Sequence, residues 1–176
     1  QRLTALIEAV LTAWDGPPLR LVYVTDAGSA ETEYYEQTLR RMLDPKRPGH
    51  YLVWQRIVDF YHASEYVHDL GRALFGAQER AAQAWSRKMC QWLKHKPRGV
   101  FRVLHSAAKL RHDGALSDSA EEDYQSAYGY LRRQMYWMDY AEYRQANLPI
   151  GSGVTEAACK TLFSQRLKLS GMRWKN

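Results

Sequence analysis

The chain has 176 residues, a length typical of one domain, and its apolar fraction of 45% and charged fraction of 25% are ordinary for a globular protein. Its net charge of +6 favours an anionic partner such as a nucleic acid. No signal peptide or membrane-spanning apolar run is present, and Cys90 and Cys159 form no disulfide or zinc pattern, which favours the reducing cytosol. Because the chain begins at Gln1 and within a helical pattern, we expect it to be a fragment of a longer protein.

The first part of the chain alternates predicted helices and strands. Helical spacing of apolar residues predicts a helix over 2–14, and a continuous apolar run predicts a buried strand over 21–24. A second helix over 31–43 and a second strand over 51–58 follow. This order is typical of a parallel sheet layer in an α/β fold.

An acidic residue follows each predicted strand. Asp26 comes after the first strand, Asp59 comes after the second, and His62 lies three residues beyond Asp59. The carboxyl ends of parallel strands are where open α/β sheets bind their ligands, so these residues are candidates for a site. The alternatives are that Asp26 begins a turn or caps the next helix, and that His62 is a hydrogen-bonding residue and not a metal ligand.

Beyond Asp59 the pattern becomes helical. No convincing strand appears between about residues 62 and 147, and helices are predicted over 77–95, 100–111 and 119–146. The third of these is expected to be one long helix. Its aromatic cluster is more typical of a core or an interface than of a base-stacking platform, and it consists of Tyr136, Trp137, Tyr140 and Tyr143.

The last stretch of the chain starts with helix-breaking residues and ends with cations. Pro149 and two glycines precede a predicted small-residue helix that carries Glu156 in its first turn, and no Asp or Glu follows Glu156. The cations after it include Lys160, Arg166, Lys168 and Arg173. A carboxylate for a metal ion and cations for phosphates are what metal-dependent phosphoryl transfer on nucleic acid requires. The alternative is a glutamate that suits the helix dipole, with a solvated basic face behind it.

Three acids could together hold a pair of divalent cations: Asp26, Asp59 and Glu156. Carboxylate oxygens suit Mg²⁺ and Mn²⁺, and paired metals can activate a water or hydroxyl and stabilise the leaving oxygen in a displacement at phosphorus. Acids at such spacing are common in loops, so the pattern is suggestive only when combined with other features.

Two stretches resemble the catalytic domain of bacterial insertion-sequence transposases of the DDE type, in their Mutator-like form. They are DFYHASE at residues 59–65, and residues 149–174, which include PIGSGVTEAACK and QRLKLSGMRW. The resemblance implies a partial RNase H-like core in an α/β fold, interrupted by a large all-helical insertion. Residues 1–61 would form the first part of the core, 62–147 the insertion, and 148–176 the catalytic helix and basic tail.

The resemblance also implies an activity and partners. It implies Mg²⁺- or Mn²⁺-dependent strand cleavage and strand transfer at transposon ends, in the bacterial cytoplasm at the nucleoid. The partners would be transposon-end and target DNA and further copies of the chain in a DNA complex. The cations Lys160, Arg166, Lys168 and Arg173 would contact DNA phosphates. The remaining alternatives are a metal-dependent nuclease without strand transfer and a non-catalytic DNA-binding remnant of a transposase.

Two assignments of the acidic triad are compatible with the resemblance. In the first, Asp26 is the second triad member and Glu156 the third, while Asp59 and His62 form a supporting Asp-x-x-His element. In the second, Asp26, Asp59 and Glu156 are the whole triad. The first is favoured because a helix followed by the strand 21–25 fits the second triad position. It places the first Asp upstream, so the chain by itself would be an inactive fragment or a degenerate transposase.

Overall fold

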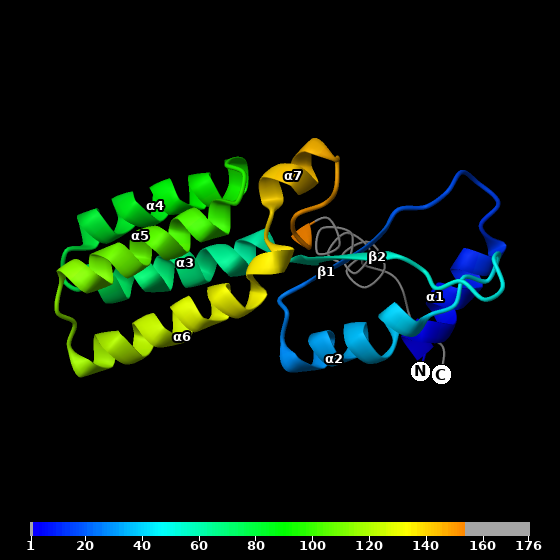
Figure 1. The fold of residues 1–176 in the computed structure, drawn as a ribbon, viewed down its shortest axis with the longest axis horizontal. Coiled ribbons are helices and arrows are strands. Elements are labelled where there is room, and N and C mark those ends of the chain that lie inside the picture. Colours follow the sequence, from blue (N-terminus) through cyan, green and yellow to red (C-terminus); the bar gives the residue numbers. More distant parts are fainter. Residues whose placement is uncertain (1, 154–176) are drawn as a thin grey trace, which may run out of the picture.

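The computed structural model describes residues 2–153, which are mostly helical and surround a small parallel sheet (Figure 1). The elements in chain order are α1 (Arg2–Ala13), β1 (Leu21–Thr25), α2 (Ser29–Gln37), the 3₁₀ helix η1 (Leu39–Arg41), β2 (Trp54–Val58), α3 (Phe60–Phe75), α4 (Glu79–His95), α5 (Gly99–Asp113), α6 (Asp118–Gln134), the 3₁₀ helix η2 (Met135–Trp137) and α7 (Tyr140–Gln145). Among these described helices, none has the length and apolar character that crossing a bilayer would need.

The sheet consists of β1 and β2, paired in parallel. Leu21 lies opposite Trp54 and Thr25 lies opposite Val58, so the two strands end at the same edge. Parallel neighbours need a crossover connection, and the segment that contains α2 supplies it. The predicted order of helix, strand, helix and strand is therefore confirmed, and both acids that follow the strands come to one edge.

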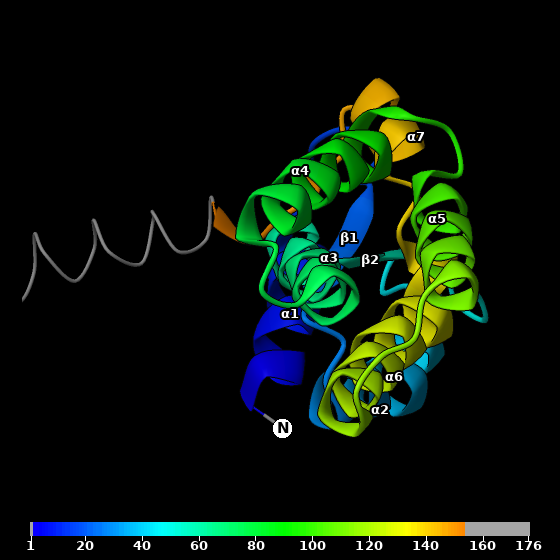
Figure 2. The same cartoon turned by 90° about the vertical axis from the view of Figure 1, so that its left-hand side faces the viewer.

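Four helices form a bundle beyond that edge. Figures 1 and 2 show α3, α4, α5 and α6 running alongside one another, with α3 in contact with both α4 and α6. The side chains between them are apolar and fully buried, and they include Val67, Leu70, Leu93, Val103 and Leu131. This packing explains the helical periodicity of the sequence after Asp59, because each helix buries one apolar face.

The ends of the bundle helices are set by local capping. Asp59 caps α3, since its side chain accepts hydrogen bonds from the backbone N–H groups of Tyr61 and His62. Ser117 caps α6 in the same way through the N–H of Ala120. Helix α6 also has acids in its first turn and arginines in its last turn, which suits the helix dipole.

The prediction of one continuous helix over 119–146 is wrong. The chain leaves the helix after Gln134 and resumes as the short helix α7 at Tyr140. Between them Met138 is fully buried. Trp137 lies against the guanidinium of Arg56, whose Cζ is 4.2 Å from the centroid of the Trp137 ring. The break turns these side chains towards the sheet, which a straight helix would not do.

Other boundaries differ less. The helices predicted over 77–95 and 100–111 are confirmed to within two residues as α4 and α5. The helix predicted over 31–43 ends at Gln37 and continues as η1, and the second strand begins at Trp54 and not at residue 51. Tyr51 instead forms an isolated antiparallel bridge with Leu43.

Candidate functional site

A pocket of about 400 Å³ lies at the carboxyl edge of the sheet. It is lined by Asp26, Asp59, Tyr61, His62, Glu65, Ser152 and Gly153. These residues come from the end of β1, the start of α3 and the segment that follows α7. The backbone N–H of Asp59 donates to the carbonyl of Thr25 at 2.8 Å, which joins the two strand ends. Three of the residues singled out in the sequence, Asp26, Asp59 and His62, therefore line one pocket.

Asp59 is buried, with 3% of its surface exposed, and its carboxylate accepts three backbone hydrogen bonds. Its Oδ1 accepts from the N–H groups of Tyr61 at 2.7 Å and His62 at 3.2 Å, and its Oδ2 accepts from the N–H of Ser152 at 2.5 Å. Burial raises the pKa of Asp59, but the hydrogen bonds from Ser152, His62 and Tyr61 outweigh it and leave the pKa below its usual value. The carboxylate is thus ionised at neutral pH, with most of its acceptor capacity in use.

Asp26, unlike Asp59, is exposed to solvent. Within the described part of the chain, its carboxylate makes no hydrogen bond and no ion pair. Its backbone, in contrast, is held in place by the hydroxyl of Tyr130, which donates to the Asp26 carbonyl at 2.7 Å. The Asp26 oxygens are therefore open to a ligand.

His62 is fixed against the wall of the pocket by three neighbours. Its Nδ1 lies 3.1 Å from Oε2 of Glu65. Its ring meets Tyr66 and Tyr130 edge to face, at centroid distances of 5.2 and 5.6 Å. Tyr66 and Tyr130 in turn stack on each other at 3.8 Å. These contacts orient the imidazole at the pocket wall, and the supporting role predicted for His62 stays a prediction.

The sequence did not indicate Tyr66 or Tyr130 as part of the site. Tyr130 lies on α6, 104 residues from Asp26, and α6 carries two further tyrosines. Nothing in the spacing distinguishes Tyr130 from those two. Its role follows only from the way the bundle packs on the end of the sheet.

The residues of this pocket fit a hard divalent cation only in part. Asp26 offers open carboxylate oxygens, which such ions prefer, whereas Asp59 is already used by three N–H groups. Among residues 2–153, no group of three or more His, Cys, Asp or Glu side chains is placed to hold a metal ion. A complete site would need a ligand from elsewhere, and Glu156 is the sequence-predicted one.

Five of the predicted site residues lie outside the described residues. They are Glu156, Lys160, Arg166, Lys168 and Arg173. Their predicted roles in metal and DNA binding therefore stay predictions. Gly153, the last described residue, lines the pocket, and Glu156 follows it three positions later in the sequence.

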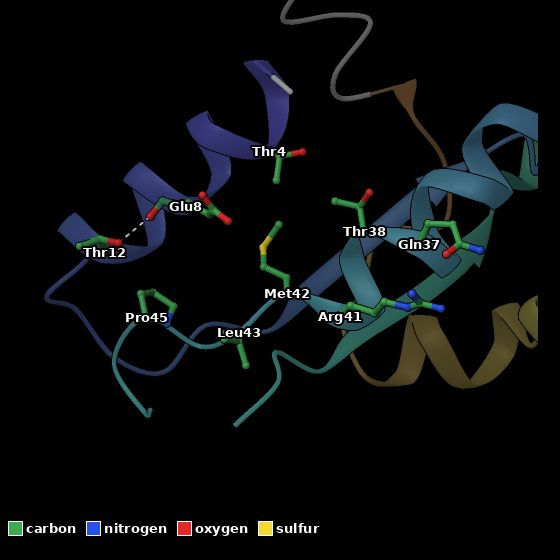
Figure 3. A pocket seen from close by; sticks show the side chains of 9 residues that line it. All are labelled: Thr4, Glu8, Thr12, Gln37, Thr38, Arg41, Met42, Leu43 and Pro45. Atoms are coloured by element: carbon green, nitrogen blue, oxygen red, sulfur yellow. Dashed lines mark hydrogen bonds between the residues drawn. The ribbon is translucent and has the colours of Figure 1, made fainter. Parts of the chain in front are cut away.

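A second pocket, of about 550 Å³, lies between α1 and the segment 37–45 (Figure 3). Thr4, Glu8 and Thr12 line it from α1, and Thr38 and Met42 line it from the other side. Helix α1, which borders this pocket, lies beyond the amino ends of the strands (Figure 1). The pocket contains no aromatic side chain and none of the predicted site residues, so we assign it no function.

Comparisons with protein-family models, with curated proteins and with solved structures find no match to this chain. The function therefore has to be argued from the pocket and from the sequence.

Proposed function

We propose that this chain is the catalytic domain, or a fragment of it, of a DDE-type transposase with a partial RNase H-like core. The observation that carries the proposal is that Asp26 and Asp59 line one pocket at the carboxyl edge of a parallel sheet. The sequence stretch that leads to Glu156 also reaches this pocket, at Ser152 and Gly153. An acidic pocket at a strand edge, in a chain with net charge +6, suits metal-dependent cleavage and transfer of DNA strands.

The residues of the chain would divide the work as follows. Asp26 and Glu156 would hold Mg²⁺ or Mn²⁺, because Asp26 has open oxygens and Glu156 follows the pocket-lining segment. When bound, such ions supply Lewis-acid activation of a water or hydroxyl and neutralise charge at the phosphate. Asp59 would hold the backbone of the site in place, since its carboxylate connects the start of α3 with the N–H of Ser152. His62 would keep Glu65 at the pocket wall.

A DNA-binding protein without cleavage activity is the second candidate. One observation favours it, namely that the Asp59 carboxylate accepts three backbone hydrogen bonds and has little capacity left for a metal ion. In that case the chain would offer a metal ion two carboxylate ligands, Asp26 and Glu156, and Asp59 would bind the ion only weakly. DNA affinity would remain, because it depends on the cations and not on the metal.

The test of the proposed function is Mn²⁺-dependent nicking of supercoiled plasmid. If Asp26, Asp59 and Glu156 are the whole triad, we expect the parent chain and the control Glu122→Gln, an exposed acid on α6, to nick the plasmid alike. If the first Asp lies upstream, we expect neither to nick it. Asp26→Asn and Glu156→Gln are expected to abolish nicking. Asp59→Asn should also abolish nicking on the whole-triad assignment, because it would then remove a metal ligand.

Other outcomes point to the alternatives. DNA binding without nicking by the parent chain would contradict the whole-triad assignment. It would leave either a transposase fragment whose first Asp lies upstream or the second candidate. Nicking without joining of a 3′-hydroxyl DNA end to a target plasmid would indicate a nuclease that lacks strand transfer.

A further inference from the structure

We propose that the helical insertion positions the two strand-end acids through two buried tyrosine hydroxyls, those of Tyr130 and Tyr140. Tyr130 lies on α6 and donates to the backbone carbonyl of Asp26 at 2.7 Å. Tyr140 lies on α7 and donates at 2.9 Å to the carbonyl of Val58, the residue directly before Asp59. The positioning itself follows from these contacts, and its consequence for metal binding rests on the proposed function.

Each of these hydrogen bonds holds one side of a peptide group that is also held on its other side. In the peptide between Asp26 and Ala27, the carbonyl accepts from Tyr130 and the N–H donates to Oγ1 of Thr25 at 3.2 Å. In the peptide between Val58 and Asp59, the carbonyl accepts from Tyr140 and the N–H donates to the Thr25 carbonyl. Both peptide planes are thus fixed between Thr25 and the insertion.

The backbone after Asp26 needs this support. Ala27 has φ of +57°, in the left-handed region that residues with a side chain rarely adopt. Such a conformation persists only where the surroundings determine it, and it is commonest at functional sites. Here the surroundings are the two hydrogen bonds of the peptide that joins Asp26 to Ala27. The direction in which the Asp26 side chain leaves the backbone is therefore set partly by Tyr130.

Both tyrosines are built to remain donors. Tyr130 is 7% exposed, and burial first of all, with Tyr66 and the acids adding to it, raises its pKa far above the ordinary value. Tyr140 is fully buried, packs edge to face on Phe60 at 5.3 Å, and its pKa is also raised well above the ordinary value by burial. Each hydroxyl therefore keeps its proton across the range in which proteins work.

Amide hydrogen exchange tests the positioning directly. In Tyr130→Phe we expect exchange at the Ala27 amide to become about fivefold faster, the effect of removing one hydrogen bond, and in Tyr140→Phe the same at the Asp59 amide. The amide of Ile57, in the buried strand, should change much less. Thr25→Val removes the Oγ1 acceptor on the other side of the Ala27 peptide and should also speed exchange there.

The matched control is Tyr124→Phe. Tyr124 is a buried tyrosine of the same helix, 4% exposed and stacked on Tyr128, and within residues 2–153 its hydroxyl makes no hydrogen bond. We expect no change at Ala27 or Asp59 in this variant. Unchanged exchange in both Tyr130→Phe and Tyr140→Phe would overturn the proposal. Equal acceleration at Ala27, Asp59 and Ile57 would also overturn it, because that pattern reports a general loss of stability.

Mn²⁺ binding, measured as free Mn²⁺ by electron paramagnetic resonance, tests the consequence for the site. We expect Tyr130→Phe to weaken binding about fivefold and Tyr124→Phe to leave it unchanged. In an Asp26→Asn background, Tyr130→Phe should have no further effect, since it acts through Asp26. If the parent chain binds no Mn²⁺, the metal part of the proposed function fails, while the exchange data still decide whether the tyrosines position the strand ends.

Discussion

At the scale of single residues, the Asp59 carboxylate is held by backbone hydrogen bonds from two separate segments of the chain. Its two oxygens receive N–H groups from Tyr61, His62 and Ser152, which belong to segments about 90 residues apart in the sequence. Within residues 2–153, these donors stabilise the negative charge and no ion pair to Asp59 is present. Asp59 therefore connects the start of α3 with the returning chain.

The pH dependence of stability should report this role. The folded-state pKa of Asp59 lies below its unfolded value of about 3.9, so Asp59 stabilises the fold above that pH, and the contribution is lost as the pH falls through the folded-state pKa. We expect the free energy of unfolding, from urea titrations between pH 6 and 3, to fall more steeply below pH ~4 in the parent than in Asp59→Asn.

Truncation gives a second measure of the same residue. Asp59→Ala removes the cap of α3 and leaves buried N–H groups without an acceptor, which should cost about 2 kcal/mol at pH 7. Identical urea curves for Asp59→Ala and the parent would contradict the hydrogen bonds described for Asp59.

Part of the site could be predicted at this scale. Asp26, Asp59 and His62 stood out because acids after buried strands are a local pattern that parallel pairing brings together. Tyr130 and Tyr140 could not be found, because the partner of a tyrosine hydroxyl on an amphipathic helix depends on contacts 104 and 82 residues away. Local spacing has no information about those contacts.

At the scale of elements, the crossing of α3 and α4 depends on one glycine. Gly71 is buried on α3, and a Cβ added there would collide with Oγ of Ser86 and lie 3.1 Å from the carbonyl of Ala82. The two helices therefore approach more closely than any larger residue allows, which lets the bundle bury Val67 and Leu70 completely.

A pair of glycine variants tests this crossing. Gly71→Ala should destabilise the protein by about 2 kcal/mol through overpacking. Ser86→Ala removes the colliding hydroxyl, so the double variant should recover part of that loss. Gly129→Ala is the control, because the added Cβ on α6 would meet only the flexible end of Arg133 and should stabilise the helix by up to about 1 kcal/mol. Thermal unfolding measures all four, and equal Tm shifts for the two glycines would contradict the close approach.

The elements also show where prediction from sequence stops. Apolar periodicity identified α4 and α5 to within two residues, since each buries one continuous face. Apolar periodicity could not reveal the break at residues 135–139. Met138 continues the apolar spacing of α6, although the α-helix has already ended and the turning backbone buries this residue. No Pro or Gly marks this break, so tertiary packing of Trp137 and Met138 decides it.

At the scale of the whole molecule, Arg56 connects the sheet to the helical part of the chain through Trp137. It lies on β2 and is 2% exposed, its Nη2 donates to Oγ1 of Thr32 at 2.6 Å, and its guanidinium lies between the rings of Tyr35 and Trp137. Burial lowers its pKa, and within residues 2–153 its Nε and Nη1 have no hydrogen-bond partner. Arg56 is therefore held by packing against aromatic rings more than by hydrogen bonds.

Substitutions of Arg56 should separate shape from charge. Lysine cannot stack as a planar group and would bury a strongly hydrated ammonium, so Arg56→Lys should cost about 2–3 kcal/mol. Arg56→Met fills similar space without a charge and should lie within about 1 kcal/mol of the parent. Arg87→Lys and Arg87→Met, at an exposed position on α4, serve as controls in the same urea titrations. A methionine variant weaker than the lysine variant would show that the charge at Arg56 stabilises the fold.

The charge distribution of the molecule gives a prediction for DNA binding. If the basic tail binds phosphates, replacing its cations by alanine should lower the slope of log K against log salt by roughly 0.9 for each phosphate that is no longer neutralised, or about 3–4 in total. The cations are Lys160, Arg166, Lys168 and Arg173. The control replaces four exposed cations of the bundle, namely Arg80, Arg87, Lys109 and Arg132. An equal decrease in slope for both sets would mean that binding is spread over the surface.

The helical segment 60–150 begins at the sheet edge and returns to it at almost the same point. The N–H of Phe60 donates to the carbonyl of Ile150 at 2.8 Å, next to the bond between Ser152 and Asp59. Because the two ends of this segment lie next to each other, another helical domain could replace residues 60–150 without displacing β1 and β2. The graft would have to bring its own hydroxyl donors to the carbonyls of Asp26 and Val58, and an aromatic ring to the guanidinium of Arg56.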